Sequence, residues 1–229
     1  MVPQGCSIGQ RVFGLTDWYR DGALAEYIAV EARNLAPLPA DVDFTVGASL
    51  VMSGLTALAG TVRSRSPSCR TECPCDWCGG HCRIDGGALA REAGAYVIGT
   101  GRGSGRQTAL DFGANEFVDP DNDGLKNVGP VDLVFDVLGG DVVKQSAALL
   151  RAGGTLVTIA GPTEAGASGG QTIDFVVEPN SAQLTEIVRR VREGRLRPNI
   201  GTIVSLDATI AAFNPATRAK GKTIIRVRP

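Results

Sequence analysis

The chain has 229 residues, of which 43% are hydrophobic and 21% charged; 30 are glycines, and the formal net charge is −1. A chain of this length buries one large core or two small ones, and its many glycines favour a turn-rich α/β fold over a helical bundle. A charge so close to zero gives no electrostatic basis for binding nucleic acid or an anionic membrane.

The start of the chain has no basic segment followed by an apolar run, so no signal peptide is expected. No stretch approaches the roughly 20 apolar residues of a membrane span. We therefore expect a soluble, cytoplasmic protein.

The first sixty residues predict two short strands and one helix. QRVFGL (10–15) and LAEYIAV (24–30) are strand-like runs, and NLAPLP (34–39) is an exit marked by proline. FTVGASLVMSGLTALAG (44–60) predicts an amphipathic helix of small residues.

From residue 88 onward, helix-like and strand-like segments alternate. The helix-like segments are ALAREAG (88–94), RQTALDFGA (106–114) and VVKQSAALLRAGG (142–154). The strand-like segments are AYVIGTG (95–101), EFVD (116–119), VDLVFDVLGG (131–140) and TLVTIAG (155–161). This alternation predicts right-handed βαβ units and a parallel sheet, whose ligands bind at the carboxyl ends of the strands.

The last third of the chain begins with the glycine-rich segment EAGASGG (164–170), which predicts a flexible loop. SAQLTEIVRRVREGRLRP (181–198) predicts a long helix with its arginines on a solvated face, and GKTIIRV (221–227) predicts a final strand.

These segments resemble a known family. GQRVFG, GALAEYIAV, LAPLP, SLVMSGLTA, ALDFGANEFVD, VDLVFDVLGG, LLRAGGTLVTIAG and GKTIIRV, in this order and spacing, resemble the medium-chain dehydrogenase/reductases, in particular the zinc-independent quinone-oxidoreductase branch. The resemblance covers about 10–60 and 88–229. It implies a GroES-like β domain, built from both chain ends, around a Rossmann-type doubly wound parallel sheet that binds NADPH. The domains expected are 1–58 and 181–229 for the GroES-like part and 59–180 for the Rossmann part.

Two features depart from the family pattern. The chain opens at VPQGCSIGQRVFG, a point that the family reaches well inside its first domain, so we expect a truncated N-terminus. Between GLTA and LAREAG the family has a strand and a glycine turn that places backbone N–H groups against a pyrophosphate. Here that place holds CRTECPCDWCGGHCRID (69–85), with five of the six cysteines and the single histidine.

One interpretation is that about 61–87 is translated one nucleotide out of register. Trp77 followed by Cys78 must then encode glycine, and each cysteine before a codon starting with C or G must encode valine or alanine. Allowed codons from Thr61 onward permit LFDHGRLPAGQSVLVTGAAGTVGSMV, which contains a strand, a glycine turn and a helix start. The string supplies the missing family segment at the right length.

Two other interpretations of the cysteine cluster stay open. The spacing C-x3-C-x-C-x2-C-x3-C beside His81 is crowded for zinc, which usually takes two well-separated ligand pairs. A disulfide knot does not suit a chain of cytoplasmic character. We expect no metal site, and neither Cys6 nor the cluster reproduces the catalytic zinc ligands of the alcohol-dehydrogenase branch.

The resemblance also implies where a cofactor would lie. After AYVIGT, NAD-specific domains place an acidic residue, whereas GTGRGSGRQ (99–107) has none. Arg102 and Arg106 are predicted to meet the 2′-phosphate of NADPH; the alternative is two solvated loop arginines.

Further cofactor contacts are predicted from the later strands and from the first helix. Gly139 and Gly140, and Ala160 and Gly161, resemble turns that approach the nicotinamide half, although ordinary strand-to-helix turns also use glycine. Thr56 in GLTA matches a family threonine near the nicotinamide, although a buried helical threonine looks the same. Asp136 in VFDV is expected to be structural rather than catalytic.

No acid–base or nucleophile constellation is present, so no catalytic residue is predicted. Hydride transfer depends on positioning of the cofactor, which agrees with an NADPH-dependent reductase of a small quinone or enone, expected as a homodimer. The alternatives are an inactive truncated Rossmann protein serving as an interaction module, and a zinc-binding module formed by the cysteine cluster. Whatever the function, we expect this chain to lack the central strand of the sheet, because that place holds a polar segment with Pro67, Glu72, Pro74 and Asp76. Poor folding or aggregation is the expected result.

Overall fold

The computed structural model describes residues 6–20, 22–63, 70–74, 81–214 and 221–228, and only the backbone at 61–63, 70–74, 81–85 and 126. The chain divides into two compact units, Met1–Leu55 with Val177–Pro229, and Thr56–Val176. The ranges 1–58, 59–180 and 181–229, with their assignment to GroES-like and Rossmann domains, stay a prediction.

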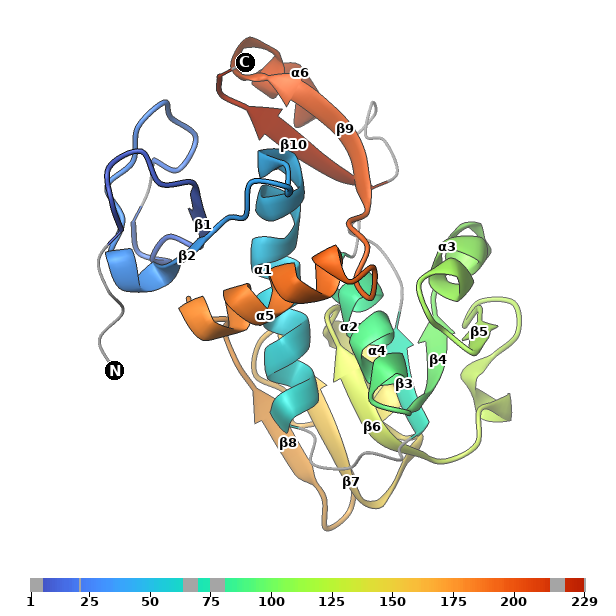
Figure 1. Ribbon diagram of the computed structural model, residues 1–229. Coiled ribbons are helices and arrows are strands. Elements are labelled where there is room, and N and C mark those ends of the chain that lie inside the picture. The colour runs from blue at the N-terminus through green and yellow to red at the C-terminus, as the bar shows by residue number, and fades with distance from the viewer. Residues whose placement is uncertain (1–5, 21, 64–69, 75–80, 215–220, 229) are drawn as a thin grey trace. The chain divides into compact units, whose positions relative to one another are not determined.

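The second unit is built on a parallel sheet of six strands in the order β5-β4-β3-β6-β7-β8 (Figure 1). The strands are β3 (Arg70–Pro74), β4 (Tyr96–Thr100), β5 (Glu116–Val118), β6 (Val131–Asp136), β7 (Leu150–Thr158) and β8 (Gln171–Asp174). Numbered within the sheet, this order is 3-2-1-4-5-6, the order of dinucleotide-binding doubly wound folds. The predicted α/β fold class is thereby confirmed.

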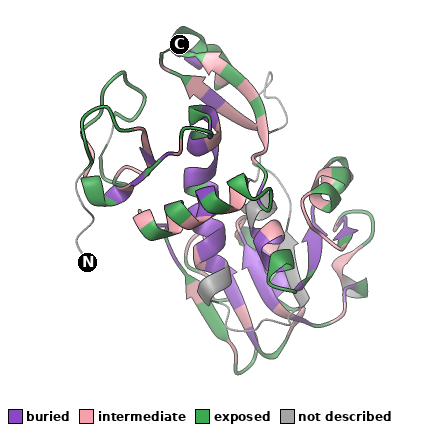
Figure 2. Cartoon of the chain, in the orientation of Figure 1, coloured by how far each residue is buried: buried purple, intermediate pink, exposed green. Residues whose placement is uncertain are grey.

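The strands β4 and β6 of this sheet are almost entirely buried, as their purple colour in Figure 2 shows. One core cluster includes Val97, Phe135 and Val157, and a second includes Val134 and Leu156. Because neighbouring residues of a strand point to opposite faces, this division shows that β4, β6 and β7 each contribute to two cores. Apolar residues on both faces therefore explain the near-continuous hydrophobic runs of β6 and β7.

The helices α2 (His81–Glu92), α3 (Arg106–Asp111) and α4 (Gly140–Ala147) connect parallel strands of the second unit. The part of α1 (Phe44–Arg63) that belongs to this unit precedes the first of these strands. A Cβ atom on Gly60 of α1 would lie 2.7 Å from the Phe135 ring, so only glycine allows this close approach of helix and sheet. The helix-like segments 88–94 and 106–114 overlap α2 and α3, and Gly94 and Gly113, just after these helices, have φ values of 86° and 110°.

The expectation that the sheet lacks its central strand is wrong. β3 pairs along its whole length with β4, from Arg70 opposite Tyr96 to Pro74 opposite Thr100, and also with β6. Ladder hydrogen bonds come from the backbone, and Pro74 occupies the last position of the strand, where a missing N–H costs least. The positions of β3, 70–74, overlap those of the strand SVLV, 72–75, in the shifted-frame string.

The first unit has two separate two-stranded sheets and the helix α5. β1 (Val12–Gly14) pairs antiparallel with β2 (Leu35–Pro37), and β9 (Ile200–Ser205) pairs parallel with β10 (Lys222–Arg226). α5 (Ser181–Arg192) begins at Asn180, whose side chain accepts a hydrogen bond from the Gln183 N–H at 2.9 Å. The short helix α6 (Thr209–Ala212) follows β9.

Several local predictions differ from the structure; the helix expected over 181–198, for example, ends at Arg192. LAEYIAV (24–30) forms no strand, because no described segment pairs with it and Leu24, Tyr27 and Ile28 are exposed. The helix expected over 142–154 ends at Ala147, and the strand begins already at Leu150. NLAPLP contributes the strand β2 rather than only an exit, and β8 and β9 were not predicted.

Among the described residues, no helix is both long and apolar enough to cross a membrane.

Candidate functional site

The carboxyl ends of the six parallel strands of the second unit lie along one edge of the sheet. The chain order reverses between β3 and β6, since β4 and β5 lie on one side and β7 and β8 on the other. Open α/β sheets bind ligands in the crevice outside such a reversal. This edge is therefore the candidate site. The family's pyrophosphate-binding turn, whose place the cysteine stretch 69–85 takes here, would follow β3, and residues 75–80 lie outside the described residues.

The turns that follow β6 and β7 lie against each other. Gly139 has a φ of 68° and a Cβ atom placed on it would lie 3.0 Å from the Cβ of Ala160. Gly140 and Gly161 also have positive φ values, of 61° and 109°, and have open space where a Cβ would stand. The structure thus brings the four predicted residues of the nicotinamide half into two adjacent backbone turns, with glycine required at 139.

A buried hydrogen-bond chain links these two turns. The Asp136 carboxylate accepts from the backbone N–H groups of Leu138 at 3.1 Å and Gly139 at 3.0 Å, and from the Thr158 hydroxyl at 2.8 Å. The Thr158 hydroxyl oxygen in turn accepts from the Ala160 N–H at 3.1 Å. Asp136 and Thr158 are 0% and 1% exposed, so the expectation that Asp136 is structural agrees with its surroundings.

The loop after β4 carries Arg102 and a short 3-10 helix, Gly103–Gly105. The buried Asp119, which follows β5, accepts from the Gly103 N–H at 2.8 Å and the Asn122 side chain at 2.8 Å. These hydrogen bonds, that from Asn122 first, hold the pKa of Asp119 below its ordinary value, against the effect of burial. A fixed carboxylate thus shapes the loop that carries Arg102.

Arg106 is the first residue of α3 and is tied to the strand beside it. Its guanidinium donates to the Phe117 carbonyl at 2.9 Å, lies 5.0 Å from the Phe117 ring centroid and forms an ion pair with Asp123 at 3.0 Å. The Arg106 side chain is still 47% exposed, so a phosphate would have access to it in competition with Asp123.

Thr56 lies on α1, and its side chain is buried at 3% exposure. It belongs to the same unit as the two turns. Its predicted place near a nicotinamide stays a prediction.

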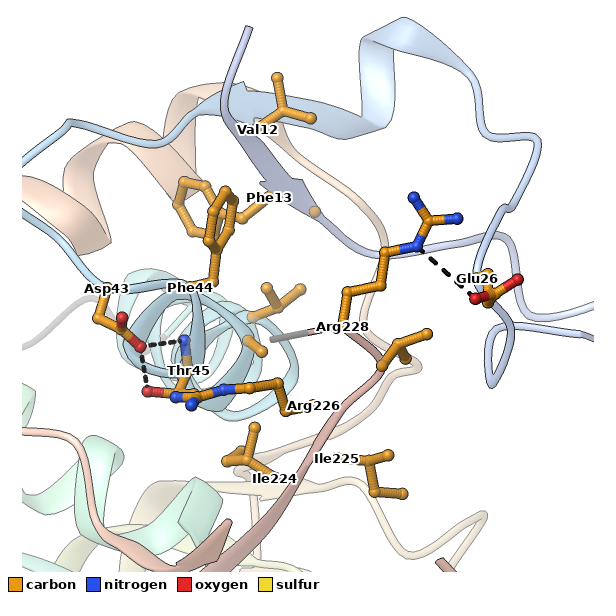
Figure 3. Close-up of a pocket in the computed structure, with 14 residues that line it drawn as sticks. Val12, Phe13, Glu26, Asp43, Phe44, Thr45, Ile224, Ile225, Arg226 and Arg228 are labelled. Atoms are coloured by element: carbon orange, nitrogen blue, oxygen red, sulfur yellow. Dashed lines mark hydrogen bonds and ion pairs between the residues drawn. The ribbon is translucent and has the colours of Figure 1, made fainter. Parts of the chain in front are cut away.

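The first unit has a pocket of about 850 Å³, separate from this edge (Figure 3). It is lined by β1, the N-terminal end of α1 and the end of the chain from Ile224 to Arg228. Its polar groups largely interact with each other: Asp43 accepts from the Thr45 N–H at 2.8 Å, and Arg228 lies 3.8 Å from Glu26. Among the described side chains, the pocket offers no pair of groups suited to acid–base catalysis.

The cysteine stretch 69–85 falls where no side chain is described, so the metal and disulfide interpretations lie outside the described residues. Among the described side chains, no group of three or more His, Cys, Asp or Glu residues could hold a metal ion, and Cys6 is a free, exposed thiol.

Sequence reasoning missed Asp119 and Thr158 as parts of this edge. Each is a polar residue at or just after the end of a buried strand, and this position was the available signal. What each residue bonds depends on the register of neighbouring strands, with Asp136 opposite Thr158, and register is not visible in the sequence.

Comparison with known proteins finds similarity to oxidoreductases. The family described as zinc-binding dehydrogenase matches residues 112–225. This matched segment contains no cysteine and no histidine, so it has no cysteine or histidine that could bind zinc.

Two curated relatives are similar over much of the chain. A zinc-type alcohol dehydrogenase-like protein of Schizosaccharomyces pombe is 24% identical over 247 residues, covering 96% of this chain and 71% of that protein. The chloroplastic NADPH-dependent alkenal/one oxidoreductase of Arabidopsis thaliana is 25% identical over 185 residues, covering 77% of this chain and 45% of that protein.

Solved structures of quinone oxidoreductases share the fold. The enzyme from Coxiella burnetii superposes with a TM-score of 0.85 at 23% identity, over 98% of this chain and 74% of that chain. The enzyme from Thermus thermophilus, whose structures include a complex with NADPH, superposes with a TM-score of 0.73 at 26% identity, over 91% of this chain and 73% of that chain.

Proposed function

We propose that this chain is a quinone-oxidoreductase-like member of the medium-chain dehydrogenase/reductase superfamily and that it transfers hydride from NADPH to a small quinone or α,β-unsaturated carbonyl. The observation that carries the proposal is the pair of adjacent turns at the carboxyl edge, where Gly139 and Ala160 leave no room for a larger side chain. Such turns let backbone atoms approach a flat ring closely.

The residues present fit a nicotinamide dinucleotide. The half-sheet β3-β4-β5 would take the adenosine half, with Arg102 and Arg106 at the 2′-phosphate, and the half-sheet β6-β7-β8 the nicotinamide half. The absence of an acidic residue over 99–107 favours NADPH over NADH. Thr56 is proposed as a further contact to the nicotinamide.

NADPH, when bound, supplies a hydride, which carries two electrons, and leaves as NADP⁺. A quinone that takes up this hydride and a proton from water becomes a hydroquinone; an enone takes the hydride at its β-carbon and the proton at its α-carbon. The chain's own contribution is to position the reactants and to limit access of water. This fits a site without a protein nucleophile.

We further propose that the reaction needs no zinc. All six cysteines and the histidine lie at or before position 82, outside the segment that matches the dehydrogenase family. Treatment with a zinc chelator is expected to leave NADPH-dependent turnover unchanged. Loss of turnover that added zinc restores would contradict this proposal.

Two further proposals concern the surroundings of the protein, a homodimer and a cytoplasmic location. Both are supported by the family resemblance. Sedimentation of the purified chain is expected to give twice the 23.8 kDa of one chain, and a monomer would contradict the first proposal. Localisation of the tagged protein to an organelle would contradict the second.

The test of the function is oxidation of NADPH, followed at the nicotinamide absorbance band, with quinones and enones offered in parallel to saturated ketones. We expect turnover with at least one member of the first two classes and none with the saturated ketones. Turnover of saturated ketones alone would replace the proposed substrate class by that of alcohol dehydrogenases.

A further inference from the structure

The two turns of the candidate site are held by side chains that are too buried to touch a cofactor. Asp136 ends β6 and Thr158 ends β7, at paired positions of the ladder, and both are almost fully shielded from solvent. A further bond, from the Ile159 N–H to the Asp136 carbonyl at 3.1 Å, fixes the backbone between them.

The hydrogen bonds from both turns converge on the Asp136 carboxylate. The Ala160 N–H donates to the Thr158 hydroxyl, which donates to the Asp136 carboxylate, which also accepts from the Gly139 N–H. A carboxylate only accepts hydrogen bonds, which suits Asp136, the acceptor for both turns. A hydroxyl both donates and accepts, which suits Thr158, the residue between Ala160 and Asp136. Breaking the bond between Thr158 and Asp136 would remove the side-chain link between the two turns, while Gly139 would keep its own bond to Asp136.

The bond between Thr158 and Asp136 lies where a small shift of either turn would change the contact between Gly139 and Ala160. Gly139 and Ala160 are already in contact, with 3.0 Å between the Cβ of Ala160 and the position a Cβ would take on Gly139. A buried network in which every member is satisfied rigidifies its surroundings. Rigid turns lower the cost of ordering the backbone when a ligand binds.

We propose that Asp136 and Thr158 are positioning residues that hold the Gly139 and Ala160 turns in register for the nicotinamide half of the cofactor. The inference rests on the proposed function and adds to it a division of labour: these two residues serve the nicotinamide half and not the adenosine half, which lies across the chain reversal between β3 and β6.

The experiment compares two ligands on the full chain. NADPH occupies both halves of the site, whereas 2′,5′-ADP occupies only the adenosine half. Thr158→Val keeps the shape of the side chain and removes the hydroxyl, while Thr158→Ser keeps the hydroxyl. Thr155→Val, at a partly buried position of the same strand with no hydrogen bond to its hydroxyl among the described residues, is the matched control.

Thr158→Val is expected to weaken NADPH binding about tenfold and to leave 2′,5′-ADP binding within about twofold of the unchanged chain. Thr158→Ser and Thr155→Val are expected to bind both ligands as the unchanged chain does. Should the Val variant fail to fold, Asp136→Asn, which keeps the shape but offers one acceptor oxygen instead of two, serves the same comparison.

Equal weakening of both ligands by Thr158→Val would indicate a general structural role and overturn the inference, as would an unchanged affinity for NADPH. In both cases the proposed function stands, because the unchanged chain binds NADPH. If the unchanged chain binds neither ligand, the proposed function fails and this inference fails with it.

Discussion

At the scale of single residues, the candidate site depends on where two arginines stand relative to their neighbours. Arg106 is bonded to Asp123 and to the Phe117 carbonyl, which ties α3 to β5, and Arg102 is an exposed residue of the loop before Gly103. Arg102 is therefore the residue whose loss would test cofactor choice without releasing α3 from β5.

Arg102→Ala is expected to weaken NADPH binding roughly tenfold or more and to leave NADH binding unchanged, because only NADPH carries the 2′-phosphate that a charged hydrogen bond would recognise. Fluorescence titration with both nucleotides measures the ratio. Arg91→Ala, on the exposed side of α2 near its C-terminal end, is the control. An equal loss of both affinities would contradict a phosphate contact.

Alanine substitutions at Gly139 and Gly153 distinguish the effect of backbone strain from the effect of a steric contact. Both have positive φ, 68° and 77°, but only at Gly139 would a Cβ meet a neighbour, the Cβ of Ala160. We expect Gly153→Ala to cost about 1 kcal/mol of unfolding free energy, and Gly139→Ala to cost more and to abolish NADPH binding. Urea denaturation and cofactor titration measure the two effects; a Gly139→Ala variant that binds NADPH normally would contradict the close approach.

At the scale of elements, the outer face of α5 shows a pH-dependent contribution to stability. The guanidinium groups of Arg189 and then Arg190 lower the pKa of Glu186 from 4.5 to about 2. A carboxyl group whose pKa is lower in the folded state stabilises the fold above its unfolded pKa, and that contribution disappears as the pH falls through the folded value.

Glu186→Gln is therefore expected to lower the free energy of unfolding by about 1 kcal/mol at pH 7, since the group is partly exposed and its ion pairs are screened. The difference should shrink between pH 4.5 and pH 2. Urea denaturation across this range measures it, with the exposed Glu178→Gln as control. A difference that persists undiminished at pH 2 would contradict the assignment.

The central strand provides a second prediction at this scale. A parallel strand buried on both faces is usually an apolar run, which the shifted-frame string supplies and the present residues 70–74 do not. Replacing residues 61–86 by that string is expected to raise the melting temperature by on the order of 10 °C and to tighten NADPH binding.

The control for this replacement is a permuted string of the same composition, which should give no gain. Sequencing of the gene around codons 61 and 87 is expected to show two compensating single-base changes. A melting temperature equal to that of the present chain would contradict the out-of-register interpretation.

The elements that could be predicted from the sequence are those whose pattern is strong on its own. The apolar strands at 131–136 and 96–100 and the long helices α1 and α5 follow from periodicity and end signals. β8 and β9 were missed because short, partly exposed strands are defined by their neighbours. LAEYIAV was overpredicted for the converse reason, since it has strand-like residues without a partner strand.

For the candidate site, the sequence revealed the glycine turns but not what holds them. Gly139 and Ala160 follow apolar strands, and a turn there is a local property. The pairing of Asp136 with Thr158 joins residues far apart in the chain, and it depends on the register of β6 and β7.

At the scale of the whole molecule, a strand order of 3-2-1-4-5-6 and similarity to oxidoreductases point to one use of the carboxyl edge. The central claim is that this edge binds a nicotinamide dinucleotide. Every residue proposed for cofactor contact belongs to the second unit, Thr56–Val176, so the claim depends on that unit alone.

The most direct measurement is isothermal titration of the full chain with NADPH and, separately, with NADH. The account predicts one NADPH per chain, bound more tightly than NADH. Absence of binding heat with either nucleotide at millimolar concentration, from a chain that melts cooperatively, would contradict it and would leave a Rossmann-folded protein that serves at most as an interaction module.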